Sequence, residues 1–131
     1  MSGVKVCRYL LANAAGVTAL VPAARIQAGV LPQATVMPAI ALTLVSGVPL
    51  LGVSIASGMQ TDRVQVTAFA ITYASLEAIL AAIRAALPYS HLTINSVNCD
   101  SILPDVIGPD GFDDVIAVHF KSQDFIVKWN A

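Results

Sequence analysis

The sequence contains few charged residues. Asp, Glu, Lys and Arg together make up 11% of its 131 residues, against roughly 25% in ordinary soluble domains. Hydrophobic residues reach 56%, and the mean hydropathy is +0.75. A monomer with this composition has too little polar surface to cover its core. The sequence therefore predicts burial against lipid or against other protein subunits.

An excess of charge of one sign is also missing. Seven Lys and Arg residues, scattered singly, stand against eight Asp and Glu, which gives a net charge of −1. Binding to nucleic acid through phosphates requires a basic patch, and so does binding to an anionic lipid surface. Neither is expected here. The two cysteines, Cys7 and Cys99, show no metal-binding or CxxC spacing, which predicts small buried thiols in a reducing compartment.

Motifs for catalysis or for a cofactor are absent from the sequence. It has no G-x-S-x-G, P-loop or G-x-G-x-x-G motif. We interpret its two histidines, His91 and His119, as packing residues within strands. One acidic cluster resembles a metal site, but it lacks the alternating pattern and the final Glu of a calcium loop, and turn propensity explains it. We expect no enzyme, no cofactor and no metal. The cluster consists of Asp105, Asp110, Asp113 and Asp114.

The longest apolar run, Met37–Met59, has the length of a membrane span. Its many Pro, Gly and Ser residues are more typical of turns, and no basic cluster flanks it. Its first part alternates large and small side chains, which predicts a strand over Ala39–Val45 with Ile40, Leu42 and Leu44 facing the core. Gly47–Met59 is predicted as an apolar loop. We therefore expect no membrane contact.

Helical periodicity marks two segments. At the N-terminus Val4, Cys7 and Leu11 share one face, whereas Asn13 interrupts the run that a signal peptide would need. The second helix begins after a cap at Ser75 and ends before Pro88. Its apolar stripe consists of Leu76, Ile79, Leu80, Ile83 and Leu87.

The rest of the chain is expected to form strands and turns. Short apolar runs predict strands near Arg25–Ile26, over Arg63–Tyr73 and over His91–Leu103, followed by a loop over Pro104–Asp114. Two further runs, Val115–Lys121 and Asp124–Trp129, predict a hairpin that turns at Ser122-Gln123. The predicted class is α+β, with a mostly antiparallel sheet of about five strands covered by an N-terminal helix and one central amphipathic helix. Residues 1–131 are expected to form a single domain.

Three segments taken in order resemble a family from tailed bacteriophages, the tail completion or tail-to-head joining proteins, which are related to tail terminators. The first is "ARIQAGVLPQATVMPAI" with Arg25 and Pro38. The second is "DRVQV" with Arg63 and Gln65, which leads into an Ala-rich helix. The third is an acidic turn followed by a segment that ends on "DFIVKW". The matching residues of that end are Asp124, Phe125, Val127 and Trp129. The resemblance spans nearly the whole chain.

The resemblance implies a structural virion protein without catalytic activity. Such proteins form a homo-oligomeric ring, typically a hexamer, at the head-proximal end of the tail. The ring terminates the tail tube and joins it to the connector or neck of the head, and genomic DNA passes through without specific binding. Assembly is expected in the host cytoplasm. The expected interface lies in the loop Val48–Met59, at Leu50, Leu51, Val53, Ile55 and Met59.

Three alternatives remain open on the sequence alone. The main one is a small cytoplasmic α+β module that binds a ligand or peptide and self-associates, for which a pocket with convergent polar groups is needed. A membrane-associated protein is the second. The third concerns only the apolar loop. In this alternative the loop folds back over the sheet of its own chain instead of contacting another subunit.

Overall fold

A computed structural model describes residues 3–29, 31–32, 36–51, 56–87, 89–94 and 97–130. The chain is a mixed α+β protein, as expected. Its helical elements are α1 (Gly3–Ala12), α2 (Ala15–Thr18), the 3-10 turn η1 (Ala23–Arg25) and α3 (Tyr73–Ala86). Its strands are β1 (Ile26–Ala28), β2 (Ala39–Leu51), β3 (Ala56–Ala70), β4 (Tyr89–Ile94), β5 (Val97–Ile107), β6 (Gly111–Asp113) and β7 (Val118–Asn130).

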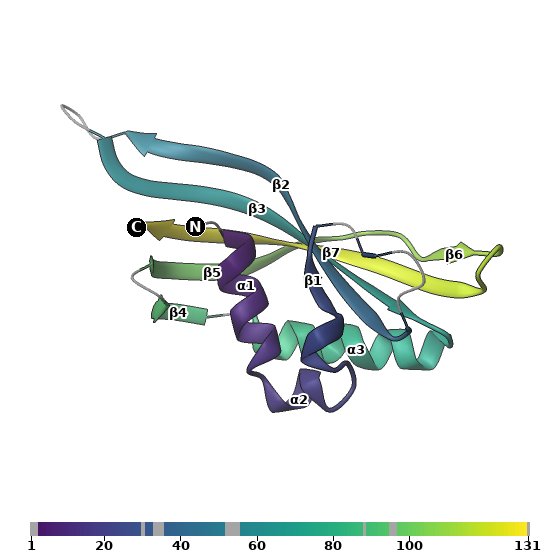
Figure 1. Ribbon diagram of the computed structural model, residues 1–131. Coiled ribbons are helices and arrows are strands. Elements are labelled where there is room, and N and C mark those ends of the chain that lie inside the picture. Colours follow the sequence, from purple (N-terminus) through teal and green to yellow (C-terminus); the bar gives the residue numbers. More distant parts are fainter. Residues whose placement is uncertain are drawn as a thin grey trace.

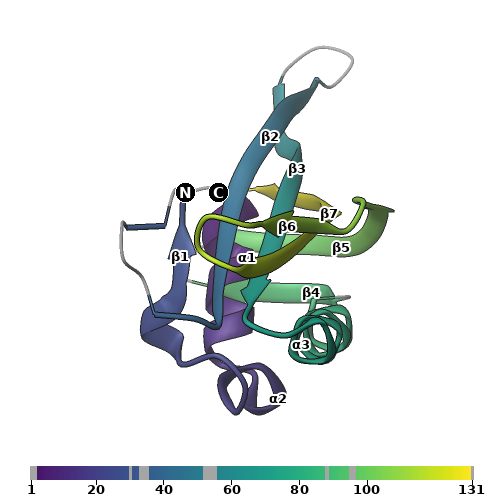
Figure 2. The same ribbon diagram turned by 90° about the vertical axis from the view of Figure 1, so that its right-hand side faces the viewer.

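The strands form one twisted sheet in the order β1-β2-β3-β7-β5-β4, with β6 also paired to β7. The predicted count of about five strands is too low, since the described residues form seven. The sheet is also not wholly antiparallel, because β1 pairs with β2 in parallel, whereas the other pairs are antiparallel. Figures 1 and 2 show the helices gathered on one side of this sheet.

The core lies between the helices and the central strands β3 and β7. Alternate residues of β3 are buried from Asp62 to Ala70, and the same period-two pattern runs from Gln123 to Trp129 in β7. Phe125 is among the largest fully buried side chains. Both strands thus present one face to the helices and leave the other face partly open.

Both predicted helices are present. Val4, Cys7 and Leu11 are buried on α1, and the whole predicted stripe of α3 is buried. The predicted cap is wrong by three residues: Thr72 caps α3, and its Oγ1 accepts a hydrogen bond from the Ser75 amide at 3.2 Å. Within the described ranges, none of the helices is long and apolar enough to span a membrane.

The predicted loop Gly47–Met59 is wrong over most of its length. β2 continues to Leu51 and β3 begins at Ala56, with Pro49 opposite Gln60. Figure 1 shows this hairpin projecting away from the helices. The pairing of β2 with β3 therefore extends beyond the part of the sheet that the helices cover. Ile40 and Leu42 are fully buried as predicted, but Leu44 is 45% exposed, because it lies where the hairpin leaves the body.

The predicted hairpin at Ser122-Gln123 is also wrong. Both residues lie within β7, opposite Thr67 and Val66 of β3. Gln123 is buried, and its Oε1 accepts a hydrogen bond from Arg84 Nη1 at 3.4 Å. Ser122 and Gln123 can thus lie within a continuous strand, because Arg84 of α3 supplies a hydrogen-bond partner for the buried Gln123 side chain. The actual turn joins β6 to β7 around Ala117, whose φ is 54°.

Two other predicted segments divide differently. The predicted strand His91–Leu103 is replaced by the antiparallel pair β4 and β5, in which Ile94 lies opposite Val97. The predicted loop Pro104–Asp114 contains the end of β5 and all of β6. The predicted sheet was too small partly because β5 and β6 carry Asn, Asp or Pro residues that are typical of turns.

Asp62 is the buried polar centre of the fold. Its carboxylate accepts hydrogen bonds from Trp129 Nε1 at 2.7 Å, from the Gly3 amide at 2.8 Å and from Gln60 Nε2 at 2.7 Å. The Gly3 amide begins α1, and a helix N-terminus favours a negative group. A Cβ at Gly47 would lie 2.7 Å from Asp62 Oδ1. Asp62 therefore connects α1, β3 and β7, and the β2 backbone at Gly47 packs closely against the Asp62 carboxylate.

We predict that Asp62→Ala destabilises the folded chain by about 3 kcal/mol, because two buried N–H donors lose their acceptor. Trp129→Phe, which removes only one donor, should cost about 1 kcal/mol through the same bond. Urea unfolding followed by circular dichroism measures both values. Asp114→Ala is the matched control: this side chain is exposed, and we expect a change below about 0.5 kcal/mol. A loss under about 1 kcal/mol for Asp62→Ala would contradict this role.

Candidate interaction surfaces

The structure describes three of the five predicted contact residues, which lie on the two strands of the β2–β3 hairpin. Leu50 and Leu51 end β2, where their backbone but not their side chains is described. Val53 and Ile55 lie outside the described residues. Met59 is in β3, half-buried and opposite Asn130 of β7. The prediction of a contact site at this tip remains a prediction.

The described part of this hairpin has an apolar surface of its own. We name the segment Leu44–Leu51 of β2 the β2 arm. Its described exposed apolar side chains are Leu44, Val45 and Val48, and Val48 is 62% exposed. Among the described strands, β1 pairs with β2 only from Ile40 to Leu42, so the arm has β3 on one side and no strand on the other.

A second apolar surface follows the opposite border of the central pair, and the sequence did not predict it. We name it the β5–β6 edge; it covers residues 103 to 116. β5 and β6 both pair with β7, while β4 pairs with β5 only as far as Ile102. Six large apolar side chains on this edge are more than half exposed: Leu103, Val106, Ile107, Phe112, Val115 and Ile116. Asp and Gly residues interrupt them in the sequence, which hides the apolar pattern.

The two motifs of the sequence resemblance meet on the face of the sheet away from the helices. Arg63 Nη1 binds Asp124 Oδ2 at 3.0 Å and also pairs with Asp105. Hydrogen bonds to Asp105 first, and then to Asp124, raise the pKa of Arg63. Gln65 lies opposite Asp124 in the β3–β7 register. The segments "RVQV" and "DFIVKW" thus lie side by side in the β3–β7 pair.

Asp110 of the predicted acidic cluster belongs to an ion-pair network. Lys121 Nζ lies 3.0 Å from Asp110 Oδ1 and 3.4 Å from Glu77 Oε1, and the Tyr73 hydroxyl donates to Asp110 at 3.1 Å. The Lys121 hydrogen bond lowers the pKa of Asp110, and the Asp110 hydrogen bond raises the pKa values of Lys121 and Tyr73. No group of three potential metal ligands gathers among the residues that the structure describes.

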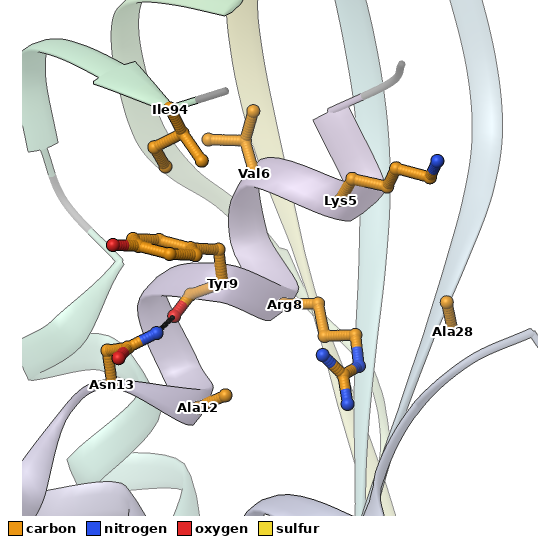
Figure 3. Close-up of a pocket in the computed structure, with 8 residues that line it drawn as sticks. All are labelled: Lys5, Val6, Arg8, Tyr9, Ala12, Asn13, Ala28 and Ile94. Carbon is orange, nitrogen blue, oxygen red and sulfur yellow. Dashed lines mark hydrogen bonds between the residues drawn. The ribbon is translucent and has the colours of Figure 1, made fainter.

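A cavity of about 360 Å³ lies beside α1. Figure 3 shows Val6, Tyr9 and Ile94 on one side of the helix and Lys5, Arg8 and Ala28 on the other. Arg8 Nε already donates to the Ile26 carbonyl at 2.9 Å, and Asn13 Nδ2 donates to the Tyr9 carbonyl at 2.8 Å. Arg8 Nε and Asn13 Nδ2 are thus already bonded to backbone carbonyls, which weakens the case for a ligand-binding module at this cavity.

The two cysteines and His119 pack within the described structure, whereas the side chain of His91 lies outside the described side chains. Cys7 and Cys99 are free thiols and are buried, as the sequence predicted. Burial raises the pKa of both, and for Cys7 the neighbouring Cys99 and Asp62 raise it further. The ring of His119 packs 4.7 Å from that of Phe112 and 6.1 Å from that of Tyr73. These contacts are those of packing residues.

We predict that both cysteines resist alkylation in the folded chain. A raised pKa lowers the thiolate fraction at a given pH, and burial blocks the reagent. Iodoacetamide at pH 8, followed by mass spectrometry, should modify them at least roughly tenfold more slowly in buffer than in urea. An Ala19→Cys variant, at an exposed position just after α2, controls for reagent activity. Rapid modification of Cys7 without urea would contradict the described burial.

Two comparisons with known proteins find matches. The family model described as tail completion protein gp17 matches residues 6–105. A chain from the solved structure titled "Virion of native gene transfer agent (GTA) particle" matches with a TM-score of 0.70 and 13% identity, over 100% of this chain and 100% of that chain. At that identity the likeness shows a shared fold. No protein with a curated description matches significantly.

Proposed function

This chain belongs to the tail completion protein gp17 family, and we propose that it is a structural component of a phage tail. It acts as a subunit of a homo-oligomeric ring, with six copies as the expected number. The ring lies at the head-proximal end, terminates the tail tube and joins it to the connector or neck. The role requires contacts between proteins and no catalysis.

The observation that carries this proposal is the family match over residues 6–105, together with the shared fold of a chain from a virion particle. Two exposed apolar surfaces support it as well, because large apolar side chains left open on a monomer mark sites that another protein covers. The near-neutral net charge of −1 suits a ring that DNA crosses without binding.

We place part of the contact surface at the tip of the β2–β3 hairpin, on Leu50, Leu51, Val53, Ile55 and Met59. Their segment has no charged residue, and charged residues are depleted at the centre of protein interfaces. The described strands of the hairpin, up to Leu51 in β2 and from Ala56 in β3, project away from the helices (Figure 1). A neighbouring subunit, the tail tube or the connector then covers this tip.

Labelled electron microscopy tests the proposed position. Antibody or gold label on the chain should mark one site on each tail, at the end that binds the head. Particles that lack the chain should show tails of irregular length or heads without tails. Label along the whole tube, or absence of the chain from purified tails, would exclude the proposed position.

We predict that the double substitution Leu51→Ser and Ile55→Ser prevents incorporation into tails and leaves the circular dichroism spectrum unchanged. Two large apolar groups at an interface are lost, while the core described above is untouched. The measurement is the amount of the chain that co-purifies with tails. Leu20→Ser, at an exposed position beside α2, is the control. Loss of folding in the double variant would instead indicate that the tip packs on its own sheet.

A further inference from the structure

We infer that the β2 arm of one copy packs against the β5–β6 edge of a second copy. The inference rests on the proposed ring and names the surfaces that join its subunits. It follows from three observations on the described residues: the place of the two surfaces in the sheet, their exposed side chains and the distribution of charge.

The two surfaces lie on opposite borders of the same central pair of strands. The β2 arm follows the outer edge of β3, and the β5–β6 edge follows the outer edge of β7. Among the described strands, none pairs with the far side of either surface. Open strand edges with apolar side chains are places where another chain adds to a sheet. One copy therefore offers two different surfaces and can meet one neighbour with each.

Both surfaces are apolar at their centres. Val48 on the arm is 62% exposed, and Val106 on the edge is 60% exposed. A β-bulge interrupts the arm between Leu44 and Ser46, and Pro49 lacks an amide donor. We therefore assign the contact to the exposed side chains rather than to a continuous backbone ladder. Phe112 on the edge adds an aromatic group of the kind that is enriched at interfaces.

The charge distribution identifies a second copy as the occupant. All eight acidic residues occur from Asp62 onward, and four of them lie on the β5–β6 edge: Asp105, Asp110, Asp113 and Asp114. Asp105 and Asp110 are paired within the chain with Arg63 and Lys121, so Asp113 and Asp114 carry the acidic charge that a neighbour can meet. The chain before Asp62 carries only Lys5, Arg8 and Arg25 as charged residues. Arg8 and Arg25 lie beside β1 and the base of β2, since Arg8 donates to the Ile26 carbonyl and Arg25 to the Pro38 carbonyl. The arm side of one copy thus complements the acidic edge of another.

Contact between two different surfaces is heterologous, and repetition of such a contact closes a ring or extends a filament. A symmetric dimer in which arm meets arm would leave the β5–β6 edge uncovered. It would also bring the basic sides of two copies together. The structure therefore favours a directional contact, arm to edge.

The test uses the purified full-length chain and two variants, Val48→Lys on the arm and Val106→Lys on the edge. Both sites are exposed in the monomer, so both variants should fold, as circular dichroism will show. Each lysine places a desolvated charge at the apolar centre of the contact and should weaken self-association roughly a hundredfold in analytical ultracentrifugation. Leu20→Lys, on the helix side, is the matched control and should associate like the unmodified chain.

Mixing the two variants gives the sharpest result. Val48→Lys keeps an intact edge and Val106→Lys keeps an intact arm, so an equal mixture should form a dimer and nothing larger. Self-association should also weaken as salt rises. An unmodified chain that stays monomeric at every concentration would overturn the inference. So would a Val106→Lys variant that still dimerises alone, since that outcome assigns the contact to arm and arm.

This experiment separates the contact from the proposed function. If the variants behave as expected but electron microscopy finds no label at the tail end, the contact stands and the proposed position fails. If the label marks the tail end and the lysine variants assemble normally, the position stands and the contact is wrong.

Discussion

The fold depends on one buried carboxylate. Asp62 accepts hydrogen bonds from the first amide of α1, from the Trp129 indole of β7 and from Gln60 on its own strand. Its surroundings are tight, because a Cβ at Gly3 would lie 3.0 Å from Asp62 Cβ and one at Gly47 would lie 2.7 Å from Asp62 Oδ1. A buried polar group that is fully satisfied in this way fixes a single arrangement of the elements around it. The β2 arm belongs to this arrangement, because its Gly47 packs against the Asp62 carboxylate.

The next residue of β3 ties the same two strands together on the other face. Because side chains alternate along a strand, Asp62 reaches Trp129 on the helix side while Arg63 reaches Asp124 on the open side. The segments that carry the resemblance to tail completion proteins therefore bind β3 to β7 through side-chain contacts on both faces of the sheet. This central pair separates the arm from the β5–β6 edge. The motif thus holds the two strands whose outer edges carry the two exposed apolar surfaces.

Sequence periodicity predicted the two helices that each bury one face. It failed for segments whose structure depends on pairing with a strand or helix that is distant in the sequence. The stripe of α3 and the apolar face of α1 are visible in the sequence because a helix repeats its pattern locally. Ser122-Gln123 has the composition of a turn, yet Arg84 and β3 hold it within a strand. Asp62 gives no local signal either, since its partner Trp129 is 67 residues away. Only the fold brings such partners together.

The exposed apolar residues also lie in places other than the single loop that the sequence predicted. The charge-free run drew attention to a single loop, whereas the described residues place exposed apolar side chains on two borders of the sheet. The second border is hard to see in the sequence because aspartates interrupt it. This difference changes the kind of assembly that follows. One apolar loop permits contact with any partner, but two unlike surfaces on opposite borders, one beside the basic residues and one acidic, favour repetition of the chain in one direction.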